Sequence, residues 1–307
     1  MEERVIYPGD LTPVQKYNGI YFKRDDLYMP YDDLPISGSK VRQHQGIIDS
    51  NYWYIKDNCD NKVYSALFLS SCQSAVIARV CREYGVNVTI FHGGTTKESI
   101  MKNKIALNAI VNKANIDIHL KSGYASVLKG EIKRRKDAGE KFFNVNLEEY
   151  ADEDPCVLWD IGLQCENLPE LDVLYVPIGS GVMCAGVLMG LYRFGISVKR
   201  VVGINISGHE NNKILNTFYK RCHINSSSNV PFTFEQTVVN IPYHKRVKVN
   251  VQNEFSLDSI YEAKAYLKML EIYNPEEKNG FWVSGNMDPI RDKVYNLKKI
   301  LQEVQSQ

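Results

Sequence analysis

The sequence predicts an α/β protein with two lobes, in which parallel twisted sheets carry helices on both faces. The first observation is that strand patterns alternate with helix patterns in two runs, at about 60–147 and 171–286. This alternation is typical of parallel sheets joined by crossover helices. The second observation is an almost wholly apolar strand at 171–178, as expected for burial on both faces. We expect a ligand between the lobes, at the carboxyl ends of the strands, where open α/β sheets bind ligands.

The first half of the chain supplies the first of these runs. Before it, the pattern predicts a short strand at 20–23, a loop at 25–35 and a helix from Gly38 to about Ser50. Gly85 follows a periodic apolar segment, which is typical of a helix that ends in a left-handed glycine. The predicted strands of the run are 63–70, 86–91, 116–120 and 142–145, and its predicted helices are 71–84, 97–113 and 125–138.

The second half begins with a helix after Pro155, which breaks the preceding segment. The apolar strand at 171–178 leads through a glycine turn into a helix at 182–192, and a polar segment lies at 225–229. The remaining predicted strands are 198–206 and 280–284, and the remaining predicted helices are 210–219, 257–272 and a terminal helix after Pro289.

Composition limits the function classes. A net charge of +1 gives no electrostatic reason to expect nucleic acid or an anionic membrane, although it does not exclude a local basic patch. No apolar run approaches membrane-spanning length, and the N-terminus has no signal-peptide pattern. Seven cysteines without a C-x-x-C pair fit free thiols in the cytoplasm, and the six histidines show no metal spacing. We therefore expect a cytoplasmic protein with no metal site.

The turn Gly179-Ser180-Gly181 follows the apolar strand and opens a helix. Backbone N–H groups converge at such a helix start, where the helix dipole is positive, so this turn is a candidate phosphate site. An ordinary tight strand-to-helix turn is the alternative. The glycine spacing matches neither a Walker loop nor a Rossmann fingerprint.

Lys40 is the second chemical signal. It follows Ser37-Gly38-Ser39, which supplies capping hydroxyls at a predicted helix start. The positive helix end disfavours a protonated amine, and a neutral lysine can form a Schiff base with a carbonyl. The alternative is a solvated surface lysine. A phosphate cradle and an imine-forming lysine together point to an aldehyde-bearing phosphate cofactor, pyridoxal 5′-phosphate.

Four segments, taken in order, resemble motifs of one enzyme family. The segments are Tyr21-Phe-Lys-Arg-Asp-Asp-Leu27 with Ser37-Gly-Ser-Lys40-Val-Arg-Gln43, then Ser70-Ser-Cys-Gln-Ser74, Gly179-Ser-Gly-Val-Met183 and Leu257-Asp-Ser-Ile-Tyr-Glu-Ala-Lys264. On these segments the chain resembles the fold type II, tryptophan-synthase-like pyridoxal-phosphate enzymes, and it most resembles their aminocyclopropane-carboxylate deaminase and D-cysteine desulfhydrase branch. The resemblance extends from about Tyr21 to Asn286.

The resemblance also implies a domain organisation. In that family the smaller lobe is an insertion shortly after the Schiff-base lysine. Residues 45–150 would form the small lobe here, and residues 1–44 with 151–307 would form the large cofactor-binding lobe. A homodimer is the expected assembly.

Several residues receive roles near the substrate and the phosphate from the resemblance. Ser71 would face the substrate carboxylate or transfer a proton, although a helix N-cap is the alternative. Cys72 stands where the family has an asparagine beside the phenolic oxygen of the cofactor, and a thiol is a weaker donor. Val182 and Met183 replace a Gly-Thr pair, which removes a hydroxyl from the phosphate loop. Ser70 and Gln73 would complete the substrate site.

The resemblance leaves two candidates for the pyridine nitrogen of the cofactor. Glu262 matches the acidic partner of the deaminase branch, which keeps that nitrogen protonated. Ser284 stands where other branches place a serine against the same atom. Tyr261 would lie near Lys40 as a catalytic residue. We take Glu262 as the first choice.

The function implied is a lyase or deaminase that acts on a small amino acid through a Lys40 aldimine and a carbanion at Cα, with Lys40 as general base or acid. One alternative is a decarboxylase or related lyase acting on an amino acid attached to a larger group, such as a modified nucleobase in a virus, which would then work in the host cytoplasm. A cofactor-binding amino-acid sensor is the non-enzyme alternative. Cys72 and Met183 favour the sensor, whereas Lys40 and Glu262 argue against it.

Overall fold

The computed structural model confirms the predicted α/β class with parallel sheets. It describes residues 7–31, 36–69, 71–119, 124–145, 156–206, 213–224, 230–293 and 295–296. The chain divides into two compact units. Unit 1 consists of Met1–Gln43 with Leu147–Asp288, and unit 2 consists of His44–Asn146 with Pro289–Gln307.

Unit 1 is built on a six-stranded sheet with the strand order β1-β2-β12-β7-β8-β9. Five of these strands are parallel to one another, and the edge strand β1 is antiparallel to β2. The strands are β1 (Val14–Tyr17), β2 (Ile20–Arg24), β12 (Asn279–Val283), β7 (Leu171–Ile178), β8 (Val198–Asn205) and β9 (Thr233–Val238).

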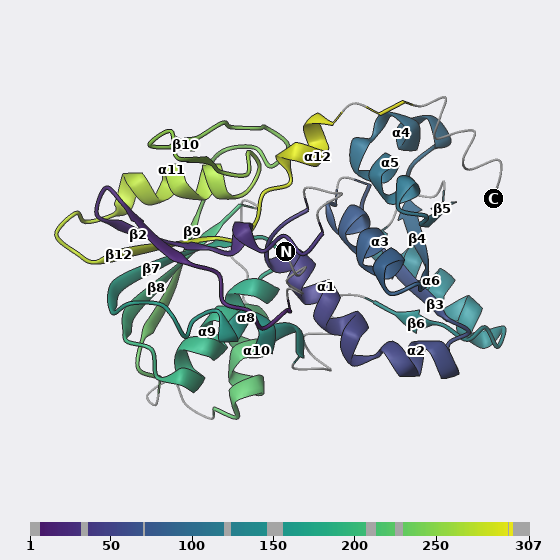
Figure 1. Ribbon diagram of the computed structural model, residues 1–307, viewed down its shortest axis with the longest axis horizontal. Coiled ribbons are helices and arrows are strands. Elements are labelled where there is room, and N and C mark those ends of the chain that lie inside the picture. The colour runs from purple at the N-terminus through teal and green to yellow at the C-terminus, as the bar shows by residue number, and fades with distance from the viewer. Residues whose placement is uncertain are drawn as a thin grey trace, which may run out of the picture. The chain divides into compact units, whose positions relative to one another are not determined.

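Helices cover both faces of this sheet. Helix α11 (Glu262–Ile272) lies on one face, and α8 (Cys156–Leu163), α9 (Val182–Phe194) and α10 (Lys213–Cys222) lie on the other (Figure 1). The apolar face of α11 packs on the strands through Ala263, Ala265 and Met269, which belong to one buried cluster with Phe22 and Phe281. The shorter elements are η1 (Asp25–Leu27), β10 (Asn250–Val251), β11 (Phe255–Ser256) and α12 (Asp288–Asp292).

Unit 2 is built on a four-stranded parallel sheet with the order β5-β4-β3-β6. Tyr64 of this sheet stacks on Phe142, with their ring centroids 4.2 Å apart. The strands are β5 (Asn115–His119), β4 (Asn87–Gly93), β3 (Lys62–Ala66) and β6 (Phe143–Asn144). Its helices are α2 (Tyr52–Asn58), α3 (Gln73–Glu83), α4 (Lys97–Lys102), α5 (Lys104–Val111) and α6 (Tyr124–Asp137), and α1 (Ser39–Ser50) begins in unit 1 and continues into unit 2.

Two predicted helices differ from the observed ones for local reasons. The helix predicted at 97–113 is interrupted at Asn103, whose extended backbone ends α4 and whose side chain accepts the Ala106 N–H at 3.0 Å to begin α5. The helix predicted at 257–272 begins only at Glu262. The Asp258 carboxylate accepts the N–H groups of Ile260 and Tyr261 at 2.9 and 3.1 Å and holds a turn there instead.

The sequence analysis did not predict β1, β9 or α2. The observed units also group Pro289–Gln307 with His44–Asn146, where Asn108 Nδ2 donates to the Tyr295 hydroxyl at 2.8 Å. The predicted lobes, 1–44 with 151–307 and 45–150, stay a prediction of domain organisation. Among the helices that the structure describes, none is both long and apolar enough to cross a bilayer.

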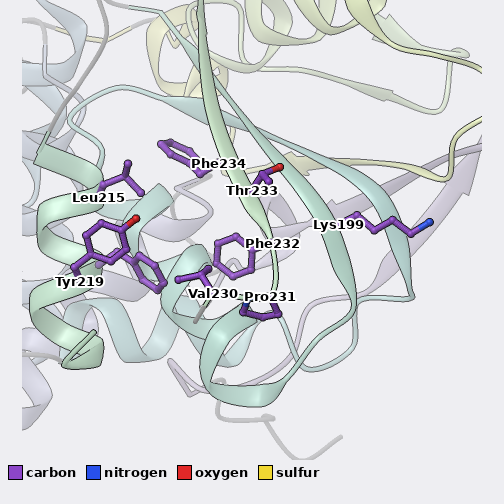
Figure 2. Close-up of a pocket in the computed structure, with 9 residues that line it drawn as sticks. Lys199, Leu215, Tyr219, Val230, Pro231, Phe232, Thr233 and Phe234 are labelled. Carbon is purple, nitrogen blue, oxygen red and sulfur yellow. The ribbon is translucent and has the colours of Figure 1, made fainter. Parts of the chain in front are cut away.

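A cavity of about 550 Å³ lies between α10 and β9. Figure 2 shows Leu215 and Tyr219 of α10 opposite Val230 and Phe232, which lead into β9. The lining is mostly apolar and contains none of the predicted site residues.

Candidate active site

The glycine turn after β7 has the backbone conformation expected where a helix N-terminus binds an anion. Gly181 has a φ of +92° and is the N-cap of α9, in a left-handed conformation that favours glycine. The first N–H groups of α9 have no acceptors within the helix and lie at its positive end. The predicted phosphate site is therefore the N-terminus of α9, a mostly buried helix that begins after a glycine.

The same turn lies against Tyr261. A Cβ atom added at Gly179 would lie 3.1 Å from Tyr261 Cε1, closer than side chains normally approach one another. Glycine at this position lets the backbone of the turn come up to the tyrosine ring. Tyr261 is the N-cap of α11, so the starts of α9 and α11 are brought together.

Lys40 lies beside the same ring. It is the second residue of α1 and is half-buried. Its Nζ atom is 5.0 Å from the centroid of the Tyr261 ring, within the range of a cation–π contact. Gly38, with a φ of +91°, makes the turn that leads the chain into α1.

Tyr243 is a member of the site that the sequence analysis missed. Its hydroxyl forms a hydrogen bond with the hydroxyl of Tyr261, and the two rings are edge-on at 5.7 Å. Lys264 holds the backbone at Tyr243. Its side chain is fully buried, and its Nζ donates to the carbonyls of Pro242 and Tyr243 at 2.8 and 2.7 Å. Tyr243 follows no strand or helix pattern, so only the tertiary structure reveals it.

Glu262 and Ser284 lie side by side. Glu262 is 2% exposed, and the Ser284 hydroxyl donates a hydrogen bond to its Oε1 atom. Burial, and then the charge of Asp258, raises the pKa of Glu262 to about 8. The hydrogen bond from Ser284 and the charge of Lys40 act in the opposite direction without cancelling this rise. The surroundings of Glu262 therefore favour the protonated form of its carboxyl.

Unit 1 thus brings together the predicted residues Lys40, Gly179, Tyr261, Glu262 and Ser284. The contacts come from three helix starts and the end of one strand, and these are far apart in the sequence.

Comparisons with known proteins bear on the fold of the chain. No family model matches the chain. A protein of Thermotoga maritima named "Putative 1-aminocyclopropane-1-carboxylate deaminase" is 23% identical over 300 residues, which cover 89% of this chain and 92% of that protein. The crystal structure of an ACC deaminase homologue matches with a TM-score of 0.69 and 18% identity, covering 97% of this chain and 95% of the other.

The chain has the fold of the fold type II pyridoxal-phosphate enzymes. The processed form of threonine deaminase isoform 2 from Solanum lycopersicum shares this fold, with a TM-score of 0.57, 12% identity and coverage of 96% of this chain and 84% of the other. The family resemblance predicted from the motifs is confirmed by this fold.

Other residues with roles implied by the fold type II resemblance lie in unit 2. Cys72 is buried and is the N-cap of α3, and Gln73 is the first residue of that helix. Ser71 Oγ accepts the Gln73 N–H at 3.4 Å, which is long for a hydrogen bond. Ser70 lies outside the described residues. The roles of all four toward cofactor and substrate stay predictions.

The predicted departures from the fold type II phosphate loop are visible in unit 1. Val182 is buried and Met183 is half-buried in the first turn of α9, while Ser180 is exposed. Val182 and Met183 bring no hydroxyl to this turn, so backbone N–H groups and the Ser180 hydroxyl are the donors that it offers.

Proposed function

We propose that the chain is a pyridoxal-phosphate-dependent lyase that acts on an amino acid through Lys40. One observation carries the proposal. The amine of Lys40, the ring of Tyr261 and the carboxyl of Glu262 are grouped beside the glycine turn that opens α9. An amine, an acid–base hydroxyl, a buried acid and an anion site are the parts that this chemistry requires.

The residues of unit 1 fit the cofactor by the chemistry of their donors. The start of α9 offers N–H groups for a phosphate, Lys40 offers an amine for an aldehyde, and Glu262 offers a buried acid for a ring nitrogen. Glycine at 179 lets the turn lie close to the Tyr261 ring, where a Cβ would come within 3.1 Å of Cε1. When bound, the cofactor supplies an electron sink for the bond that breaks at Cα.

Protein groups supply the proton transfers in this proposal. Lys40, once its amine is released, takes a proton from Cα or returns one. The Tyr261 hydroxyl, which shares a hydrogen bond with Tyr243, is a second group that can hold a proton near Lys40. The buried carboxyl of Glu262 would hold the ring nitrogen of the cofactor by a hydrogen bond.

The reaction proposed first is removal of the α-proton followed by elimination from a small amino acid. The names of the similar proteins, which include deaminases and ammonia lyases, support this class. Decarboxylation at the same Cα is the alternative. Incubating the loaded protein with a panel of D- and L-amino acids, and assaying ammonia, sulfide, keto acid and carbon dioxide, tests both. A spectral change with no product from any compound would instead indicate the sensor.

The glycine turn yields a prediction for cofactor binding. Gly181→Asp forces a side chain into a left-handed backbone and adds a negative charge, so we expect cofactor affinity to fall about tenfold or more. Gly195→Asp is the matched control, because Gly195 is also left-handed (φ +62°) but ends the same helix with nothing within 4 Å of an added Cβ. Met183→Thr should leave affinity unchanged or increase it. Fluorescence titration of the unloaded protein with the cofactor measures all three, and full cofactor occupancy in Gly181→Asp would mean that the turn has no such role.

One observation favours the second candidate, a lyase whose amino acid is attached to a larger, anionic group. The segment 236–253, which carries Tyr243, contains no acidic residue. His244, Lys245 and Lys248 follow Tyr243 closely and are exposed. Basic side chains that follow Tyr243 in the sequence favour a phosphate-bearing substrate.

This second candidate predicts salt-sensitive turnover. We expect Lys245→Ala combined with Lys248→Ala to raise KM about tenfold for an amino acid esterified to a nucleoside 5′-phosphate, and the wild-type KM to rise with ionic strength. KM for free amino acids should not change. Lys213→Ala combined with Lys220→Ala, on α10, is the control. Equal KM effects on free and phosphate-bearing substrates would reject this candidate and leave the first one standing.

A cytoplasmic homodimer is the proposed state of the enzyme. Seven cysteines without a C-x-x-C pair support a reducing compartment.

A further inference from the structure

Ser284 is bound on two sides. Its hydroxyl donates to Glu262, and its backbone carbonyl accepts the Ser39 N–H at 2.7 Å and lies 3.1 Å from the Ser39 hydroxyl. Ser39 immediately precedes Lys40. Ser284 therefore links the turn that carries Lys40, through its backbone carbonyl, to the carboxyl of Glu262, through its hydroxyl.

A buried ion pair holds Ser39 in place. The Ser39 hydroxyl lies 2.7 Å from Asp25 Oδ2, and Arg42 donates to Asp25 Oδ1 at 2.8 Å with both side chains fully buried. The guanidinium of Arg42 also donates to the carbonyls of Pro8 and Asp10. Because each charge has several partners, this ion pair fixes a geometry and does not leave an unpaired buried charge.

The backbone segments on either side of Ser39 and Ser284 are also packed closely. A Cβ added at Gly285 would lie 2.8 Å from the Ser37 carbonyl oxygen, so only glycine allows this approach. The Ser37 hydroxyl accepts the Asn286 N–H at 3.1 Å and closes the contact. The end of β12 and the start of α1 therefore behave as one rigid junction.

We propose that Ser284 is a positioning residue that acts on the cofactor through Glu262, and that Ser39 fixes Ser284 for this task. This inference rests on the proposed function. It gives Glu262 and Ser284, the two candidates for the ring nitrogen, complementary roles. In this proposal Glu262 would contact the ring nitrogen of the cofactor, and the Ser284 hydroxyl orients the Glu262 carboxyl. Ser284 stands where some fold type II branches have a serine, and Glu262 stands where the deaminase branch has a glutamate. In this chain the two residues are joined by a hydrogen bond.

The electrostatic role of Ser284 follows from the groups around Glu262. Asp258, in the turn before α11, opposes ionisation of the carboxyl, whereas Lys40 from α1 and the Ser284 hydroxyl from the end of β12 favour it. Ser284 is the neutral donor in this set. Its removal should leave Glu262 protonated to a higher pH, because a buried carboxylate would lose a hydrogen-bond donor.

The first test uses the protein without cofactor. We expect Ser284→Ala to raise the pKa of Glu262 by about one unit or more, measured by carboxyl NMR of ¹³C-Glu-labelled protein with Glu262→Gln to assign the signal. Ser259→Ala is the matched control, since the Ser259 hydroxyl also donates to a carboxylate, that of Asp288 at 2.8 Å. Ser284→Thr keeps the hydroxyl, so Glu262 should titrate as in the wild type. Comparing Ser284→Thr with Ser284→Ala separates loss of the donor from misfolding.

The second test is a double-mutant cycle on the loaded enzyme. Ser284→Ala should lower turnover in the wild-type background and have no further effect in Glu262→Gln, because its action passes through the carboxyl. An unchanged Glu262 titration, or an equal loss of turnover in both backgrounds, would overturn the proposal and make Ser284 an independent partner of the cofactor. The titration needs no cofactor, so a failure of the proposed function itself would appear separately, as a protein that does not load at Lys40.

Discussion

Replacing Lys40 by alanine should abolish turnover and the visible absorbance of the loaded protein while leaving the fold intact. The change removes both the amine that binds the aldehyde and the group that transfers the proton, so we expect turnover to fall by at least about 10³-fold. Lys40 is only half-buried, so the free energy of unfolding should change by no more than about 1 kcal/mol. Absorbance spectroscopy, product assays and urea unfolding measure the three effects.

Lys16→Ala is the control for this experiment. Lys16 lies in the same unit, with its Nζ 4.7 Å from the centroid of the Tyr21 ring, so the change removes a similar contact on β1, which carries none of the reacting groups. It should retain full turnover. Comparable losses in Lys16→Ala and Lys40→Ala would mean that the effect comes from lost packing on tyrosine and not from chemistry.

Replacing Glu262 by glutamine is expected to slow turnover by about 10²–10³-fold with nearly normal cofactor binding. Glutamine keeps the shape and can accept the Ser284 hydrogen bond, but its amide has no acidic proton to transfer to the ring nitrogen. The lost interaction matters most when negative charge builds up in the transition state, so kcat should change more than KM. Ser284→Ala should be milder. Normal turnover in Glu262→Gln together with failure of Ser284→Ala would make the serine the partner of the ring nitrogen.

Glu262 should also make the stability of the unliganded protein depend on pH. Its pKa is raised to about 8 in the folded chain from a usual value near 4.5, so the native state holds a proton that the unfolded state has lost between these values. Wild-type stability should therefore fall as pH rises from about 5 through 8, relative to Glu262→Gln. Urea unfolding of both proteins at pH 6 and pH 9 checks this sign. The same pH dependence in both would mean that another group is responsible.

The sequence was most informative where local structure decides the outcome. The buried strand 171–178 and the helix start at Val182 are observed as predicted, because apolar runs and glycine turns act over a few residues. Lys40 and Glu262 could be singled out from motifs because each lies at the start of a helix, where a short pattern is visible. The interruption at Asn103 was missed because a side-chain cap can outweigh the helical periodicity around it.

Tertiary contacts account for the rest. Tyr243 reaches Tyr261 only because Lys264, on a different element, holds its backbone. The sequence presented Glu262 and Ser284 as alternatives, since nothing in their local patterns says that they touch. Their hydrogen bond follows from the packing of α11 beside the end of β12, which no local pattern encodes.

The most direct measurement of the central claim is the position of the cofactor on the chain. Loading the protein with pyridoxal phosphate, reducing it with borohydride and mapping the labelled peptides by mass spectrometry identifies the lysine that forms the Schiff base. The proposed function predicts one label, on Lys40. A label on Lys264 or on any other lysine, with Lys40 unmodified, would contradict it.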